Sequence, residues 1–78
     1  MEFDYSNLRK RIREKHLSEG LFAIRLGLSK SALSLRLNNH LFFSQRDIAM
    51  ALRVLGIPKE EVGNYFLCRK KDVWREFW

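Results

Sequence analysis

SEGLFAIRLGLSKSALSLRLNN, residues 18–39, predicts two short helices joined by a tight turn. Ser18 and Ser29 are good N-caps, because their hydroxyls can accept a backbone N–H of the first helical turn. Gly27 can adopt the left-handed conformation that ends many helices. Apolar residues recur at spacings of three and four, as in helices that bury one face. The residues predicted to face inward are Phe22, Ala23, Leu26, Ala32, Leu33 and Leu37.

The flanking sequence predicts three further helices. The first begins near Asp4, which is expected to serve as its N-cap. Another begins after Ser44, which approximates a capping box with Asp47. The last begins at Pro58, a position where the missing N–H of proline costs nothing. Further residues expected to face the core are Leu8, Ile12, Ile48, Ala51, Leu52, Leu55, Val62 and Phe66.

The length and composition predict one small all-α domain of five helices with a short C-terminal tail. The 78 residues allow a single core, and one proline with four glycines leaves few breaks for strands. We expect the domain to span residues 1–66 and the tail to span residues 67–78. The tail is rich in aromatic residues and could form a helix or a strand.

The charge balance favours an anionic partner. Fifteen Lys and Arg against nine Asp and Glu give a net charge of +6, with five of the basic residues in the run RKRIREK at 9–15. Nucleic acid is the commonest partner of so basic a small domain. The alternative is that the basic residues only keep the protein soluble.

Several functional classes find no support in the sequence. The single cysteine, Cys68, fits a reducing cytoplasm, and no apolar run suggests export or a membrane span. His16 and His40 lack Cys or acidic partners at metal-ligand spacing. The serines are better explained as caps and polar contacts than as nucleophiles. We therefore expect no enzyme activity, no cofactor, no metal and no small-molecule substrate.

Four residues carry a resemblance to a known family. Ala23 is small where the two helices of the 18–39 segment would cross, Gly27 follows four residues later, Leu28 is apolar within the turn, and Leu33 is apolar in the second helix. The segment resembles the Cro/repressor-type helix-turn-helix domain of bacteriophage regulators, over roughly residues 4–66.

Two positions differ from that family pattern. Glu19 and Gly20 stand where family members commonly carry Gln, and a carboxylate there would repel a DNA phosphate unless it is paired. Arg36 stands where the family often has an apolar residue, which here comes one position later at Leu37. The second difference predicts a slightly rotated or shifted second helix within the same fold.

The resemblance implies a sequence-specific double-stranded DNA-binding transcriptional regulator. In this motif the N-terminal end of the second helix enters the major groove. The residues predicted to contact bases are Lys30, Ser31, Ser34 and Leu35, with Lys30 as the strongest donor to guanine. The residues predicted to contact phosphates are Ser29, Asn38, Asn39, His40, Ser44, Gln45 and Arg46.

Operator binding by this motif requires two subunits, because dimers read two half-sites. The residues predicted to form a homodimer interface are Val73, Trp74, Phe77 and Trp78, since aromatic residues often anchor interfaces. Alternatively, the tail folds back to complete the small core. A second functional interpretation is a protein-interaction module on the same fold, such as an antirepressor, an antitoxin-like protein or an inhibitor.

Overall fold

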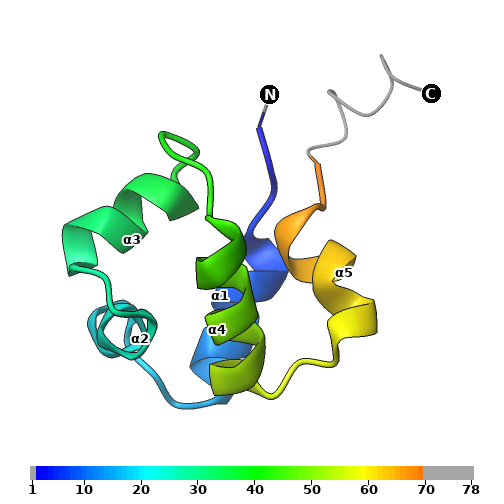
Figure 1. The fold of residues 1–78 in the computed structure, drawn as a ribbon, viewed down its shortest axis with the longest axis horizontal. Coiled ribbons are helices and arrows are strands. Elements are labelled where there is room, and N and C mark those ends of the chain that lie inside the picture. The colour runs from blue at the N-terminus through cyan, green and yellow to red at the C-terminus, as the bar shows by residue number, and fades with distance from the viewer. Residues whose placement is uncertain (1, 70–78) are drawn as a thin grey trace.

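The structure of the protein is a computed structural model that describes residues 2–69 (Figure 1). The described residues form an all-α fold of five α-helices, which confirms the predicted fold class. None of these helices has the length and apolar character needed to cross a membrane. The helices are α1 (Ser6–Glu14), α2 (Glu19–Leu26), α3 (Lys30–Leu37), α4 (Gln45–Leu55) and α5 (Val62–Phe66), and the 3-10 turn η1 (Lys59–Glu61) precedes α5.

The predicted caps set the bounds of the central helices. The side chains of Ser18 and Ser29 accept backbone N–H groups at the starts of α2 and α3, each at 3.0 Å. Ser44 forms a complete capping box at the start of α4. Gly27 and Gly56 end α2 and α4 with φ angles of 75° and 64°, in the left-handed region that glycine tolerates best.

The core lies where the five helices meet. One part of it is aromatic: the Tyr5 and Phe43 rings meet edge to face at 5.3 Å, and Phe43 meets Phe66 at 5.2 Å. Leu28 in the α2–α3 turn packs against the core while staying partly exposed. The predicted inward residues that are buried are Leu8, Ile12, Phe22, Ala23, Leu26, Leu33, Leu37, Ala51, Leu55 and Phe66. The others are only partly buried, namely Ala32, Ile48, Leu52 and Val62.

The first helix begins later than the sequence predicts. Tyr5 occupies the N-cap position of α1, and Asp4 instead accepts the Ser6 backbone N–H at 2.8 Å. The backbone of Asp4 is engaged elsewhere, because its N–H donates to the Cys68 carbonyl at 2.6 Å. Phe3 and Arg69 form an antiparallel bridge beside it. This pairing joins the residues just before α1 to those just after α5.

The last predicted helix is also shorter than expected. Pro58 precedes η1, and the α-helix proper starts only at Val62. The predicted tail largely falls beyond this point. The dimer contacts predicted for Val73, Trp74, Phe77 and Trp78 lie outside the described residues and stay a prediction.

Candidate recognition face

The helices α2 and α3 meet across a tight turn, as the sequence predicts. Ala23 and Leu33 are fully buried, and the Leu28 N–H donates to the Ala23 carbonyl at 2.9 Å. In Figure 1, α2 and α3 lie at one side of the molecule, away from α5. This packing leaves the outer sides of both helices open to a partner.

The four predicted base-contacting residues lie together on α3. Lys30, Ser31, Ser34 and Leu35 line one shallow hollow on its outer side. The Lys30 side chain makes no hydrogen bond or ion pair with any described residue. Leu35 is 43% exposed and gives the hollow an apolar wall. The hollow therefore offers an exposed cation, two hydroxyls and an apolar contact.

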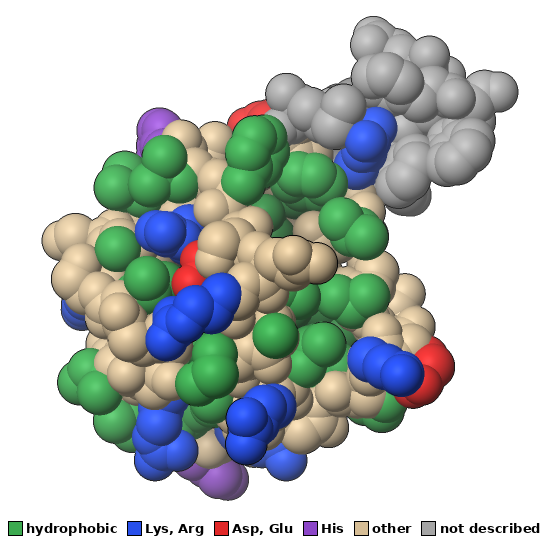
Figure 2. Space-filling view, in the orientation of Figure 1, with side chains coloured by type: hydrophobic (Ala, Val, Ile, Leu, Met, Phe, Trp, Pro, Cys, Tyr) green, Lys and Arg blue, Asp and Glu red, His purple; other side chains and the backbone are tan. Residues whose placement is uncertain are grey.

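The outer side of α2 is apolar as well. Leu21 and Ile24, three residues apart, are 40% and 71% exposed. Figure 2 shows apolar and basic side chains mixed on the side of the molecule formed by α2 and α3, with few acidic ones. We call Leu21, Ile24, Lys30 and Leu35, with the two serines of the hollow, the recognition face. Exposed apolar side chains on neighbouring helices are typical of contact surfaces for other proteins.

The carboxylate at the start of α2 is paired. Glu19 Oε2 lies 2.5 Å from Nη1 of Arg9 in α1, and both side chains are partly exposed. Its charge is therefore compensated within the protein. The same contact engages one member of the basic run at 9–15.

Arg36 and Asp47 connect α3 to α4. Arg36 Nε donates to Asp47 Oδ2 at 3.0 Å, and Arg36 Nη1 donates to the Ala32 carbonyl at 2.8 Å. Asp47 is only 3% exposed, yet it has a polar partner on both sides because it also accepts the Ser44 N–H at 3.0 Å. Burial alone would raise the pKa of Asp47, but the hydrogen bonds from Ser44 and the Arg36 guanidinium outweigh it and lower this pKa. Arg36 is thus engaged within the protein, between α3 and the start of α4.

Several residues predicted to contact phosphates have internal partners. Ser29 and Ser44 cap helices, and the Asn38 amide donates to the Ser34 carbonyl at 2.9 Å. Arg46 Nη1 donates to the Leu26 carbonyl at the end of α2 at 3.3 Å. Two others, His40 and Gln45, are exposed. The structure brings these seven residues to the α3–α4 region, but it gives most of their side chains a local structural role.

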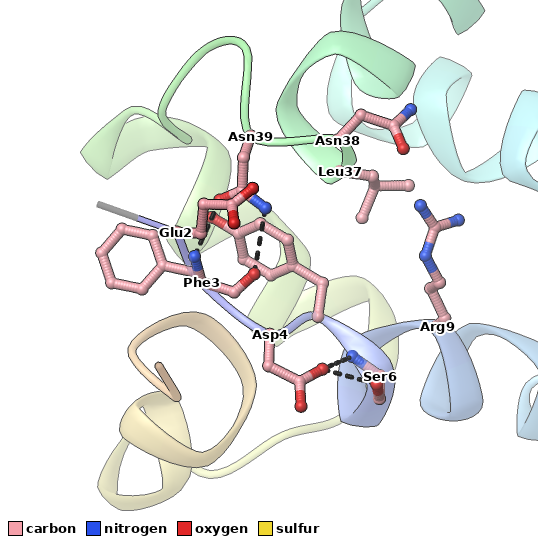
Figure 3. Close-up of a pocket in the computed structure, with 9 residues that line it drawn as sticks. Glu2, Phe3, Asp4, Ser6, Arg9, Leu37, Asn38 and Asn39 are labelled. Carbon is pink, nitrogen blue, oxygen red and sulfur yellow. Dashed lines mark hydrogen bonds between the residues drawn. The ribbon is translucent and has the colours of Figure 1, made fainter. Parts of the chain in front are cut away.

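Asn39 holds the N-terminal segment in place. Its side chain accepts the Phe3 N–H at 2.8 Å and donates to the Phe3 carbonyl at 3.0 Å (Figure 3). Its backbone is left-handed, with φ of 66°. The sequence predicts a phosphate contact here and gives no sign of this role, because the partner lies 36 residues away.

The pocket beside Asn39 is polar. Figure 3 shows Glu2, Asp4, Ser6 and Arg9 around it, with Asp4 accepting from Ser6. Among residues 2–69, no three His, Cys, Asp or Glu side chains come together as metal ligands. The carboxylates of this pocket therefore do not form a metal centre within the described part of the chain.

Residues 1–69 match the family described as "Protein of unknown function (DUF739)". The chain belongs to the DUF739 family. This DUF739 member is also similar to a solved structure, the solution structure of the modulator of repression (MOR) of the temperate bacteriophage TP901-1 from Lactococcus lactis. The two are 36% identical with a TM-score of 0.72, over 85% of this chain and 89% of the other. No curated protein matches the chain.

The solved relative is a phage regulatory protein by its name. That agrees with the phage-regulator part of the resemblance seen in the sequence. The name states that the relative modulates repression and says nothing of DNA. Operator binding and dimer formation by this DUF739 member therefore stay predictions.

Proposed function

We propose that this protein is a phage regulator of repression that acts by docking its recognition face on a protein partner. The observation that carries the proposal is the exposure of Leu21, Ile24 and Leu35 on adjacent helices. Such residues become the buried centre of a protein interface, which excludes water around a few anchors. The similarity to a modulator of repression supports a repressor protein as the partner.

The neighbouring polar groups also favour protein over DNA. In a helix-turn-helix complex the first helix crosses the DNA backbone, and Leu21 and Ile24 offer no hydrogen bond there. Arg46, which could have contacted a phosphate, is directed at the Leu26 carbonyl. A protein partner could bury these apolar side chains and would need no phosphate-binding residues from α2. We place the protein in the cytoplasm as a non-enzymatic binding protein.

Titration calorimetry with the purified repressor of the same phage tests this proposal. Ile24→Ser should weaken binding by about tenfold or more, which corresponds to about 1.4 kcal/mol for loss of one interface anchor. Phe42→Ser is the matched control, because Phe42 is 73% exposed but lies in the α3–α4 loop. Absence of binding, or an equal loss with Phe42→Ser, would rule the proposal out.

The second candidate is a Cro/repressor-type DNA-binding regulator acting as a homodimer on a two-half-site operator. The observation that favours it is Lys30, which is unpaired within the described residues at the start of α3. With Ser31 and Ser34 beside it, Lys30 could donate to guanine O6 and N7 in a major groove. The net charge of +6 would assist by attracting the phosphates.

Selection of bound sequences from random duplex DNA tests the second candidate. If the second candidate is correct, we expect an enriched operator, binding that weakens steeply with salt, and relaxed sequence preference for Lys30→Ala. Lys59→Ala, in η1, is the matched control and should keep the preference. Failure to enrich any sequence, or binding insensitive to salt, would exclude this mode.

A further inference from the structure

A second apolar surface adjoins the recognition face at one edge, where the Leu41 N–H donates to the Leu35 carbonyl at 3.2 Å. Leu41 and Phe42 in the α3–α4 loop are 48% and 73% exposed. The Phe42 ring meets the partly buried Phe3 ring edge to face, with 6.3 Å between centroids. We call Phe3, Leu41 and Phe42 the Phe42 patch. Neither proposed function uses it.

The described chain ends beside this patch. Arg69 pairs with Phe3 in the antiparallel bridge, and its guanidinium carbon lies 6.0 Å from the centre of the Phe3 ring. The Asp4 N–H to Cys68 carbonyl bond, at 2.6 Å, fixes the adjacent residues. In Figure 1 the first and last described residues and the α3–α4 loop lie at the same end of the molecule. The last described residue, Arg69, therefore lies close to the patch.

The sequence that follows is suited to cover the patch. Residues 70–78, KKDVWREFW, contain four large apolar side chains. Trp74 follows Arg69 by five residues, which can span up to about 17 Å. The Arg69 guanidinium lies 6.0 Å from the Phe3 ring, and the Phe3 ring lies 6.3 Å from the Phe42 ring. The reach of the five residues exceeds these two distances combined.

We propose that the C-terminal segment 73–78 docks on the Phe42 patch of its own chain. Aromatic rings favour offset or edge-to-face contacts such as those of Phe3 with Phe42, and burial of either tryptophan there removes apolar surface from water. The short connection after Arg69 gives the segment a high effective concentration at its own patch. This inference does not depend on the proposed function.

Intrinsic fluorescence of the full-length chain tests the docking. Trp74 and Trp78 are the only tryptophans, so the emission reports on the C-terminal segment alone. The expected result is emission at shorter wavelength, with less acrylamide quenching, than that of a free peptide of residues 70–78. Phe42→Ser should shift both values towards those of the peptide. Ile24→Ser is the matched control and should change neither, since Ile24 is equally exposed but lies on α2.

The same measurement distinguishes docking of the chain's own segment from occupation of the patch by a second copy of the chain. Circular dichroism should show that Phe42→Ser keeps the helices, and Leu41→Ser should reproduce its effect. Emission like that of the free peptide in the wild-type chain would overturn the proposal. So would emission unaffected by Phe42→Ser. A blue shift that appears only at concentrations where light scattering detects dimers would also overturn it and assign the patch to a second copy.

Discussion

At the scale of single residues, Asp47 has two structural roles, one within its own helix and one towards a neighbouring helix. Its carboxylate completes the capping box of α4 and pairs with Arg36 of α3. A buried carboxylate without partners would be strongly destabilising, whereas this one is paired on both sides. The pair therefore joins α3 to the start of α4.

The two ion pairs between helices should differ greatly in energetic importance. The Arg36–Asp47 side chains are 17% and 4% exposed, whereas those of Arg9 and Glu19 are 34% and 39% exposed. We expect Arg36→Met to lower the free energy of unfolding by about 3 kcal/mol, because it leaves a buried charge without its cation. Arg9→Met should cost less than about 1 kcal/mol. Urea unfolding of both variants measures the difference, and equal costs would contradict this view.

Asp47 should also make the free energy of unfolding fall at acidic pH. Its folded-state pKa lies below the ordinary value of 3.8, so its contribution is fully present above that value. The contribution is lost as the pH falls through the lower folded-state pKa. We expect the stability gap between wild type and Asp47→Asn to be largest at neutral pH and to shrink below about pH 4. Urea unfolding between pH 7 and pH 2.5 measures it, and parallel profiles would refute the role of Asp47.

At the scale of elements, local sequence predicts the helices whose ends are set locally. Ser18, Ser29 and Ser44 start helices, and Gly27 and Gly56 end them, because each acts on backbone groups within a few residues. The start of α1 is different, because Phe3 and Asp4, which precede it, pair with Arg69 and Cys68. Such pairing leaves no local signal in the sequence.

Gly27, which ends α2 with a left-handed backbone, and Gly63, which lies within α5, give a matched test of the turn geometry. Gly27→Ala should cost about 1–2 kcal/mol, because φ is 75° there and an L side chain is strained in that region. The added methyl would meet only the Arg46 guanidinium, at 3.7 Å, so the cost is in the backbone. Gly63→Ala, inside α5 with open space around it, should gain up to about 1 kcal/mol. Thermal unfolding measures both, and a neutral Gly27→Ala would contradict the turn geometry.

The sequence predicts the exposed residues of the candidate site but not the internal partners of its arginines. The sequence predicts Lys30 and Leu35 as outward residues of the second helix, and the structure places them on one hollow. It does not predict that Arg36 and Arg46 serve α4 and α2, because a long cation can find partners that depend on how the helices pack. Tertiary contacts thus decide which basic residues are left for a partner.

At the scale of the whole molecule, part of the positive charge is used internally. Arg11 Nε donates to the Leu55 carbonyl at 3.1 Å and its Nη2 donates to the Gly56 carbonyl at 3.2 Å, closing the end of α4. Arg9 pairs with Glu19. The basic run at 9–15 therefore joins helices as well as adding to the long-range field. The same internal use of polar groups extends to the chain ends, where Asn39 binds Phe3.

The contact between Asn39 and Phe3 should stabilise the whole fold, because it joins the α3–α4 loop to the segment that pairs with residues 68–69. Asn39→Gly removes two hydrogen bonds while keeping the left-handed backbone, so we expect a loss of about 2 kcal/mol. Hydrogen exchange at the Phe3 and Asp4 amides should accelerate, whereas Asn38→Ala, an exposed neighbour, should leave them protected. Unchanged exchange and stability, together with weaker duplex binding, would instead assign Asn39 to phosphate contact. The two roles therefore separate in a single pair of variants.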